Sequence, residues 1–508
     1  MPNAIRPIVS IFDPMLKILS SGQIREWDAF TISNEPIASI DLMERACRAF
    51  VVWFAEHFNA SRRVGVVCGT GNNGGDGLGI ARMLRDWGYT VRVWIVKGQG
   101  QGSADFNTNR QRLPQAIPVA EVTQPGDPMD FSACDIIIDG IFGSGLSRQP
   151  EGIYAYAIER INDAQATRVA IDIPSGLMVD GPSTGAIVRA HYTVTFQSPK
   201  LAFYLPGSYP FTGEWHVVDI GLLDAFLDNV TTTTYQVQRK DVRRIRKRRS
   251  KFGHKGDYGR AVIVAGGYGK MGAAVLCARA ALRSGLGLLT LHVPECGYQI
   301  VQTAVPEAMA RVDAGAHAIT ELPGVEADAV GIGPGIGTAD ATAKAFRRFL
   351  EEHRKPMVID ADALNILSAN AGLIDLVPPQ SILTPHPREF ERLAGPWSDD
   401  FARLNLVREF ARRHKVIVVL KGAYSTIASP DDNVYFNPTG NPGMATGGSG
   451  DVLTGILTGI LAQGYEPLET AIMGVYLHGR AGDVAAADKG TEGLIASDLI
   501  EYLPQAFR

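Results

Sequence analysis

Residues 64–84 read VGVVCGTGNNGGDGLGIARML, and this stretch alone predicts the fold class of the chain. It begins as a short apolar run that ends at Cys68, passes through glycines with two Asn and one Asp among them, and enters a helical pattern near Leu78. A buried strand that leads through a glycine-rich turn into a helix is typical of a parallel α/β sheet. The backbone N–H groups at such a junction can bind phosphate, and the helix dipole assists them.

The same alternation of apolar runs and helical patterns continues through both halves of the 508-residue chain. In the first half, the other runs that read as buried strands are residues 90–96, 135–138 and 168–171. In the second half, they are residues 261–264, 286–293, 329–332, 356–359 and 415–420. This alternation predicts two α/β domains, each with a parallel sheet covered on both faces. We place the first domain at residues 1–225, a linker at 226–239 and the second domain at 240–508.

The bulk composition excludes several classes of protein. The 49 basic and 53 acidic residues give a net charge of −4, so neither nucleic acid nor a membrane is predicted as a partner. The five cysteines are scattered without CxxC spacing, which argues against a disulfide framework and against a Cys-type zinc site. No signal peptide is evident, and no apolar run of about 18 residues is present to span a membrane. We therefore expect a cytoplasmic protein.

One basic run, residues 240–251 (KDVRRIRKRRSK), stands out from this balance. Three interpretations stay open: a nucleic-acid or membrane patch, a segment near a polyphosphate site, and a solvated linker or first helix of the second domain. We favour the last, because the run is single and has no aromatic residues interleaved with it.

Polar residues follow three predicted strands of the first domain. Asn73 lies after the first of them, Asp139 after another, and Asp172 and Ser175 after a third. Because the carboxyl ends of strands in an open parallel sheet share one crevice, we expect these side chains to converge. A single Asp after a strand is more often a helix cap than a catalyst, but three such loops together favour a site. Oxygen ligands with little charge would suit a monovalent or weakly held cation.

Residues 69–74 also satisfy the dinucleotide-binding pattern GxGxxG, which is a weak signal when it stands alone. A nicotinamide-binding Rossmann domain would offer an acid to the ribose at the end of the second strand, where this chain has Val96, Lys97 and Gly98. Redox use of NAD is therefore not predicted.

A second glycine-rich loop, residues 441–451 (NPGMATGGSGD), lies directly before an apolar helical pattern at 452–461. Its amides would form an anion hole at a helix N-terminus. Asp451 has an alternative interpretation as a helix cap, but ribokinase-like kinases use such a turn to place a base beside a transferring phosphate. Residues 421–426 would line the base and ribose of the nucleotide. Gly269 and Lys270 do not form a P-loop, because Met271 replaces the required Ser or Thr.

The strings GTGNNGGDG, DGIFGSGL and DIPSGL resemble the N-terminal domain of the NAD(P)H-hydrate repair proteins, the YjeF family. The resemblance covers roughly residues 10–225 and implies a Rossmann-like epimerase that interconverts the R and S forms of the hydrates NADHX and NADPHX. It implies that Asp172 faces the nicotinamide ring and exchanges protons, and that K⁺ is held by Asn73, Asp139 and Ser175. The residues implied to contact the hydrate, besides Asp172, are Asn72, Asn73, Gly74, Gly75, Asp76, Gly143, Ser144, Gly145, Leu146, Ser147, Arg148 and Gln149.

The strings HPREFERLAG and NPGMATGGSGD resemble the C-terminal dehydratase domain of the same family, from about residue 240 to the end. This resemblance implies a ribokinase-like α/β fold that uses ADP and Mg²⁺ for dehydration. Asp451 would deprotonate the hydrate hydroxyl, which attacks the terminal phosphate of ADP; phosphate then leaves and NAD(P)H is restored. The residues implied to contact the hydrate are Ala274, Gly335, His386, Pro387, Arg388, Glu389, Phe390, Glu391, Arg392 and Asp451. Those implied to bind ADP are Lys421, Gly422, Ala423, Tyr424, Ser425, Thr426, Asn441, Pro442, Gly443, Met444, Ala445, Thr446, Gly447, Gly448, Ser449 and Gly450.

Two other functions stay open at this point. The second domain could be a small-molecule kinase, such as one for a vitamin precursor, with the first domain as its ligand sensor. A kinase would release a stable phosphorylated product, whereas a dehydratase would release free phosphate and NADH absorbance. Alternatively, the first domain could be a non-catalytic binding or scaffolding module, although Asp76, Asp139 and Asp172 argue against a decayed site. Family members are often oligomeric, so the resemblance also implies a homo-oligomer.

Overall fold

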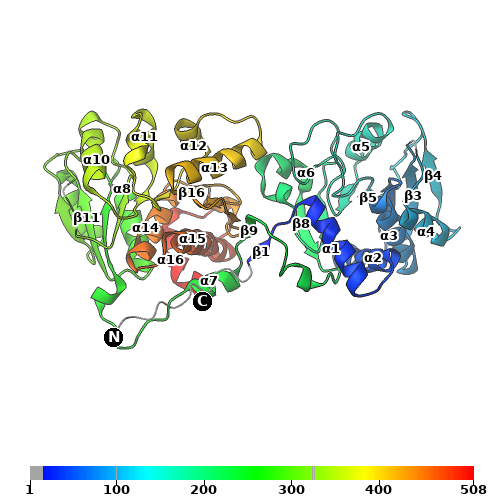
Figure 1. Ribbon diagram of the computed structural model, residues 1–508, viewed down its shortest axis with the longest axis horizontal. Helices are drawn as coiled ribbons and strands as arrows, with labels where there is room; N and C mark the ends of the chain where they lie inside the picture. The colour runs from blue at the N-terminus through cyan, green and yellow to red at the C-terminus, as the bar shows by residue number, and fades with distance from the viewer. Residues whose placement is uncertain (1–14, 99, 323, 325) are drawn as a thin grey trace. The chain divides into compact units, whose positions relative to one another are not determined.

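The computed structural model describes residues 15–98, 100–322, 324 and 326–508 (Figure 1). The prediction that no signal peptide is present rests largely on residues 1–14, which lie outside this description. The described residues divide into two compact units. The N-terminal unit holds Ile18–Thr232 and Asp399–Phe401, and the C-terminal unit holds residues 15–17, Thr233–Ser398 and Ala402–Arg508. None of the helices in the described residues is long and apolar enough to cross a membrane.

The N-terminal unit is built on a seven-stranded sheet in the order β4-β3-β2-β5-β6-β7-β8, and every neighbouring pair is parallel. Its strands are β2 (Arg63–Cys68), β3 (Thr90–Val96), β4 (Val119–Val122), β5 (Ile136–Gly140), β6 (Thr167–Ile171), β7 (Tyr192–Phe196) and β8 (Glu214–Val218). Its α-helices are α1 (Ser21–Asn34), α2 (Ser39–His57), α3 (Asn72–Asp86), α4 (Ala104–Arg112), α5 (Ile153–Asp163) and α6 (Tyr209–Thr212). The predicted Rossmann-like parallel sheet is confirmed.

From Val64 onward, the side chains of strand β2 are apolar on both faces of the sheet, because both faces are covered. Val64, Val66 and Cys68 lie in the core that the sheet forms with α2 and α3, whereas Val67 lies in the core on the α5 side. Successive side chains of a strand point to opposite faces, so a strand covered on both faces needs apolar residues at every position. The carboxyl ends of these strands are therefore the places where polar side chains can gather.

The C-terminal unit is built on an eleven-stranded sheet in the order β1-β9-β18-β17-β16-β15-β14-β13-β10-β11-β12. Its strands are β1 (Leu16–Lys17), β9 (Thr234–Gln236), β10 (Arg260–Val264), β11 (Leu288–Val293), β12 (Met309–Val312), β13 (Ala329–Ile332), β14 (Val358–Ile359), β15 (Ile382–Leu383), β16 (Ile417–Leu420), β17 (Thr426–Ala428) and β18 (Val434–Phe436). Its α-helices are α7 (Arg239–Ile245), α8 (Met271–Arg283), α9 (Tyr298–Ala304), α10 (Asp340–Glu352), α11 (Ala361–Ala369), α12 (Pro387–Ala394), α13 (Asp400–His414), α14 (Ser449–Ala462), α15 (Pro467–Lys489) and α16 (Ala496–Ala506). Strands β10 to β16 pair in parallel, and β17 pairs in antiparallel orientation with both β16 and β18.

One edge of this sheet is formed by segments that were predicted to lie outside the second domain. Strand β9 lies in the segment predicted as a linker, but it pairs with β18 in parallel and with β1 in antiparallel orientation. Residues 15–17 therefore belong to the C-terminal unit, although the predicted first domain begins at residue 1. The physical reason is that a sheet edge presents unpaired backbone groups, which an extended segment from elsewhere in the chain can satisfy.

The basic run at 240–251 is partly helical, because α7 spans Arg239–Ile245. Beyond this helix, Lys247 and Arg249 place their charged groups over the rings of Tyr465 and Tyr258, at 4.5 and 4.1 Å from the ring centroids. Such cation–π contacts fix these two side chains against their own unit. The interpretation of the run as the first helix of the second domain is confirmed for α7.

Candidate active sites

The glycine-rich stretch of the N-terminal unit is the first turn of a helix. Helix α3 begins at Asn72, so the expectation that it begins near Leu78 is wrong. The glycines let α3 lie against its neighbours: a Cβ atom at Gly77 would lie 2.7 Å from the Cys68 Sγ, and one at Gly79 would lie 2.6 Å from the Cys47 Sγ. Tertiary packing therefore overrides the low helix propensity of glycine. The N–H groups of the first turn have no intrahelical partner and can bind an anion.

This packing makes a prediction about two glycines of the same stretch. A Cβ atom at Gly74 would lie 1.9 Å from the Gly69 carbonyl oxygen, whereas one at Gly71 would have nothing within 4 Å. Gly74→Ala is therefore expected to destabilise the N-terminal unit by about 1–3 kcal/mol, as overpacking does. Gly71→Ala is the matched control and should leave stability nearly unchanged. Urea unfolding monitored by Trp fluorescence checks this, and equal midpoints for the two variants would contradict it.

The three predicted potassium ligands lie together. The Asp139 carboxylate accepts hydrogen bonds from the Ser175 Oγ at 2.6 Å and from the Ser175 N–H at 2.8 Å, and both residues are fully buried. The Asn73 side chain is 8% exposed and lies against Gly143, where a Cβ atom would be 3.2 Å from the Asn73 Cγ. Burial raises the pKa of Asp139 to about 6, although the hydrogen bonds from Ser175 and Ile141 lower it. The Asn73 Nδ2 has no hydrogen-bond partner within the described residues.

Asp172 has an uncommon backbone conformation directly after β6. Its φ is +63°, which is rare for a residue other than glycine and recurs at functional sites. Its N–H donates to the Val194 carbonyl at 2.8 Å, and its side chain contacts Lys200, a fully buried residue that the sequence did not single out. Burial raises the pKa of Asp172, but the charge and hydrogen bond of Lys200, with further donors from the backbone and Thr195, outweigh it. The pKa of Asp172 therefore lies below its usual value.

Two further carboxyl groups lie near Asp172. Burial and the charges of Asp172, Asp28 and Asp105 raise the pKa of Asp76 well above its usual value. Burial and Asp172 likewise raise the pKa of Asp28 to about 6, against the opposing effect of Lys200. Asp28 lies on α1 and the sequence did not predict it, because no motif surrounds it. The site therefore combines one carboxyl group that favours ionisation with two that favour protonation.

Residues 143–149, which the sequence predicts to contact the hydrate, form a half-buried to exposed loop after β5. Its Gly143 adjoins Asn73, as described above, and a Cβ atom at Gly145 would lie 3.5 Å from the Arg25 Nη2 on α1. The Gln149 Oε1 accepts a hydrogen bond from Thr184 at 2.8 Å. The loop thus lies beside the first turn of α3 and near Arg25 of α1.

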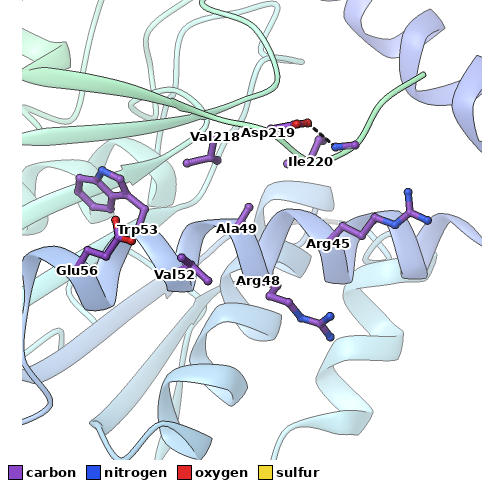
Figure 2. Close-up of a pocket in the computed structure, with 10 residues that line it drawn as sticks. Arg45, Arg48, Ala49, Val52, Trp53, Glu56, Val218, Asp219 and Ile220 are labelled. Carbon is purple, nitrogen blue, oxygen red and sulfur yellow. Dashed lines mark hydrogen bonds between the residues drawn. The ribbon is translucent and has the colours of Figure 1, made fainter. Parts of the chain in front are cut away.

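The N-terminal unit also has an open pocket of about 660 Å³ that is distinct from these residues. Figure 2 shows it between α2 and the segment that follows β8. Its lining residues are Arg45, Arg48, Ala49, Val52, Trp53, Glu56, Val218, Asp219, Ile220 and Gly221. None of the predicted site residues is among them, so the volume of this pocket does not locate the chemistry.

In the C-terminal unit, Asp451 lies in the first turn of α14. The helix begins at Ser449, three residues before the predicted helical pattern, and Gly448 precedes it with a φ of +90°. Glycine adopts this left-handed conformation without steric cost. Burial raises the pKa of Asp451 to about 6, and the charges of Asp360 and Asp362 add to the effect while Lys421 opposes it. A carboxyl group with such a pKa can take up a proton near neutral pH.

A buried ionic network lies beside Asp451. Asp360, at the end of β14, is 1% exposed; its Oδ1 lies 2.9 Å from the Lys421 Nζ, and its Oδ2 accepts a hydrogen bond from the Thr454 hydroxyl at 2.7 Å. The Lys421 Nζ also lies 3.9 Å from the Glu389 carboxylate on α12. A Cβ atom at Gly450 would lie 3.4 Å from the same Nζ. The structure therefore brings Lys421, Glu389 and Gly450 together, and it adds Asp360 and Thr454, to which the sequence assigned no role.

The segment 386–392 forms the start of α12. The His386 Nδ1 accepts hydrogen bonds from the N–H groups of Arg388 and Glu389, and the Glu389 carboxylate accepts one from the His386 N–H, which completes a capping box. Within the segment, the Phe390 side chain is fully buried. The Arg392 guanidinium donates to the Asn365 side chain at 2.7 Å.

The other two residues predicted to contact the hydrate lie at a different turn. A Cβ atom at Gly335 would lie 3.1 Å from the Lys270 Cβ, and Ala274 is fully buried on α8 with its Cβ beside Gly266. Lys270 forms an ion pair with Asp362 at 3.2 Å, and Asp362 also accepts a hydrogen bond from the Gly337 N–H. The charge of Asp362 also raises the pKa of Asp451, so this turn influences the carboxyl group in the first turn of α14.

Helix α15 anchors the predicted nucleotide segment 441–450. The N–H of Gly440 and the side chain of Asn441 donate to Asp483 at 3.1 and 3.2 Å. The Nε2 of half-buried His478 lies 3.0 Å from the Ser449 carbonyl oxygen. Burial lowers the pKa of His478 to about 4, so the ring is neutral at pH 7. The sequence missed both anchors, because 29 or more residues separate each from its partner.

In the other predicted nucleotide segment, residues 422–426, the Ser425 hydroxyl donates to the Gly422 carbonyl at 3.2 Å. Thr426 then begins β17, and the Ser425 carbonyl accepts from the N–H of Asn437. This tight turn follows Lys421 and so lies beside the Asp360 network.

Comparisons with known proteins agree with this two-site arrangement. Residues 39–202 match the family described as YjeF-related protein N-terminus, and residues 261–505 match the family described as NAD(P)H-hydrate dehydratase. The bifunctional NAD(P)H-hydrate repair enzyme Nnr of Moorella thermoacetica is 36% identical over 97% of this chain and 96% of that protein. The enzyme of the same description from Thermofilum pendens is 35% identical over 97% of this chain and 96% of that protein.

Among solved structures, the ADP/ATP-dependent NAD(P)H-hydrate dehydratase of Bacillus subtilis, crystallised with ATP and Mg²⁺, is 31% identical with a TM-score of 0.47. The match covers 53% of this chain and 95% of that one. The two full-length relatives and the two matched families decide the assignment. The chain belongs to the family of bifunctional NAD(P)H-hydrate repair enzymes.

Proposed function

We propose that the N-terminal unit interconverts the R and S hydrates of NADH and NADPH, and that the C-terminal unit dehydrates the S hydrate with ADP as phosphoryl donor. The observation that carries this proposal is that each unit holds a carboxyl group able to move protons beside helix N–H groups able to bind phosphate. Asp172 and α3 form this pair in one unit, and Asp451 and α14 form it in the other. We also infer a homo-oligomer from the family resemblance.

The dehydration needs a better leaving group than hydroxide. Asp451 takes the proton of the hydrate hydroxyl, and the oxygen attacks the terminal phosphorus of ADP, so that AMP leaves. The carbon–oxygen bond of the phosphate ester then breaks while the neighbouring ring carbon loses a proton, which gives NAD(P)H and phosphate. The N–H groups at the start of α14 and the Lys421 ammonium stabilise the negative charge of the transferring group.

The residues beside Asp451 fit a magnesium–nucleotide complex. No group of three or more His, Cys, Asp or Glu side chains within the described residues is arranged as a complete metal site. Mg²⁺ typically keeps several waters and is bound by substrate phosphates with one or two carboxylates. Here Asp360, beside Asp451, is the carboxylate that would hold it. When bound, the ion would neutralise charge on the phosphates.

The buried oxygens of the N-terminal unit fit a potassium ion. Asn73, Asp139 and Ser175 supply amide, carboxylate and hydroxyl oxygens, and all three residues are buried. A cation there would compensate for the buried Asp139 charge and would hold the loops after β2, β5 and β6 together. Its contribution is structural and electrostatic.

The test of the dehydratase proposal is a product assay with S hydrate and ADP. The expected products are NADH, AMP and free phosphate in equal amounts. A stable phosphorylated hydrate or vitamin precursor, with no NADH formed, would instead favour the kinase alternative.

The raised pKa of Asp451 predicts the pH dependence of dehydration. Because Asp451 acts in its ionised form, kcat measured at saturating ADP and hydrate should fall as the pH drops through about 6. Asp362→Asn should move this midpoint to lower pH, since removal of a nearby negative charge favours ionisation of Asp451. A rate that stays constant to pH 5, or an upward move in Asp362→Asn, would contradict this role.

A further inference from the structure

Lys200 is a fully buried lysine whose ammonium contacts Asp172. Its side chain is 1% exposed, and lysine is almost never fully buried unless it is paired. We propose that Lys200 is a positioning residue for epimerisation: it holds Asp172 by one carboxylate oxygen, so that the other oxygen is left for the hydrate. This inference rests on the proposed epimerase function.

The surroundings of the Lys200 ammonium account for all three of its donors. The Nζ lies 2.7 Å from the Asp172 Oδ1, 3.0 Å from the Phe196 carbonyl oxygen and 3.1 Å from the Ser198 carbonyl oxygen. A protonated lysine has three N–H donors, whereas a neutral amine has only two. Three acceptors at hydrogen-bond distance therefore match the charged form, and they fix the direction of the Nζ–Oδ1 contact.

The two oxygens of Asp172 differ in their partners. The Oδ1 accepts from Lys200, from the Thr195 hydroxyl at 3.1 Å and from the Phe196 N–H at 3.2 Å. The Oδ2 has no hydrogen-bond donor within the described residues, while the side chain keeps 11% of its surface exposed. A half-turn about the Cβ–Cγ bond exchanges the two equivalent oxygens and restores the same three contacts, so one oxygen is always held while the other has no donor. The Oδ2 is thus the oxygen available to take up and return a proton.

The charges around Asp172 favour this arrangement. Lys200 follows β7, Asp76 projects from α3 and Asp28 from α1, and these are the titratable groups that face it. Burial and mutual repulsion raise the pKa values of Asp76 and Asp28, whereas the contacts of Lys200 keep the pKa of Asp172 low. The buried positive charge of Lys200 therefore selects Asp172 as the ionised member of the three.

The test measures epimerisation of purified S hydrate against pH in the full chain, with the uncatalysed rate subtracted. Lys200→Met should slow epimerisation below neutral pH and move the acidic limb of kcat/KM upward by about 1–3 pH units, the usual effect of losing an adjacent opposite charge. Thr195→Val removes an uncharged donor from the same oxygen and should move the limb in the same direction by less. A role in folding alone would lower the rate at every pH without moving the limb.

Circular dichroism shows whether the N-terminal unit of each variant is folded, and dehydratase turnover shows that the C-terminal unit is intact. If Lys200→Met does not fold, Thr195→Val decides: an unmoved acidic limb overturns the inference. A folded Lys200→Met with the wild-type pH profile also overturns it. These outcomes are separable from failure of the proposed function, which would show as no epimerisation above the uncatalysed rate in the unaltered chain.

Discussion

Replacement of Asp451 by Asn is expected to lower the rate of dehydration by about 10²- to 10⁴-fold, the usual contribution of a positioned general base. The amide keeps the shape of the side chain at the first turn of α14 but cannot take the hydroxyl proton. Epimerisation of the hydrates by the same protein should be unchanged. Dehydration is measured as NADH formed from S hydrate and ADP, and epimerisation as R hydrate formed from S hydrate without ADP.

The control for Asp451→Asn is Asp340→Asn, which removes a carboxylate from the first turn of α10. Both substitutions remove a negative charge from the first turn of a helix, but only Asp451→Asn also removes the proposed base. Asp340→Asn should therefore keep the dehydration rate of the wild type. The melting temperature of Asp451→Asn should not fall, because burial disfavours the ionised carboxyl group that the substitution removes. Full dehydratase turnover in Asp451→Asn would refute the assignment of Asp451 as the base.

Replacement of Asp172 by Asn is expected to abolish epimerisation and to leave dehydration of pure S hydrate intact. On a mixture of R and S hydrates, this variant should stop when the S fraction is used up, apart from slow uncatalysed conversion. The variant also leaves the buried Lys200 ammonium without its carboxylate partner, so the N-terminal unit should unfold at lower denaturant concentration.

The matched control for Asp172→Asn is Asp163→Asn, which removes an exposed carboxylate at the end of α5. It should change neither activity nor stability, since exposed ion pairs contribute little. Conversion of the R hydrate at the wild-type rate by folded Asp172→Asn would contradict the role of Asp172 in epimerisation.

The parallel sheets could be predicted because their physical cause is local. A strand that is buried on both faces must be apolar at every position, so runs such as residues 136–138 and 261–264 identified β5 and β10 directly. Edge strands lack this signature. Strands β1 and β9 have only two and three residues and form because each finds an unpaired neighbour, which no local pattern reveals.

The candidate sites were predictable only where a motif marks them. Asp139, Ser175 and the first turn of α3 were found because their glycine-rich surroundings are distinctive, and the structure brings them together. Lys200, Asp28 and Asp360 act through partners that lie 28 or more residues away in the chain, so their importance depends on tertiary contacts. The starts of α3 and α14 were placed too late, because packing stabilises glycine-rich turns as helix.

The most direct test of the two-site account is the extent of conversion of an R and S hydrate mixture by the full chain with ADP, Mg²⁺ and K⁺. We predict that all of the hydrate becomes NADH, with one AMP and one phosphate released for each NADH, because one unit supplies the S form that the other consumes. Conversion that stops at the initial S fraction would contradict epimerase activity in the N-terminal unit. Release of a stable phosphorylated product without NADH would contradict dehydration in the C-terminal unit.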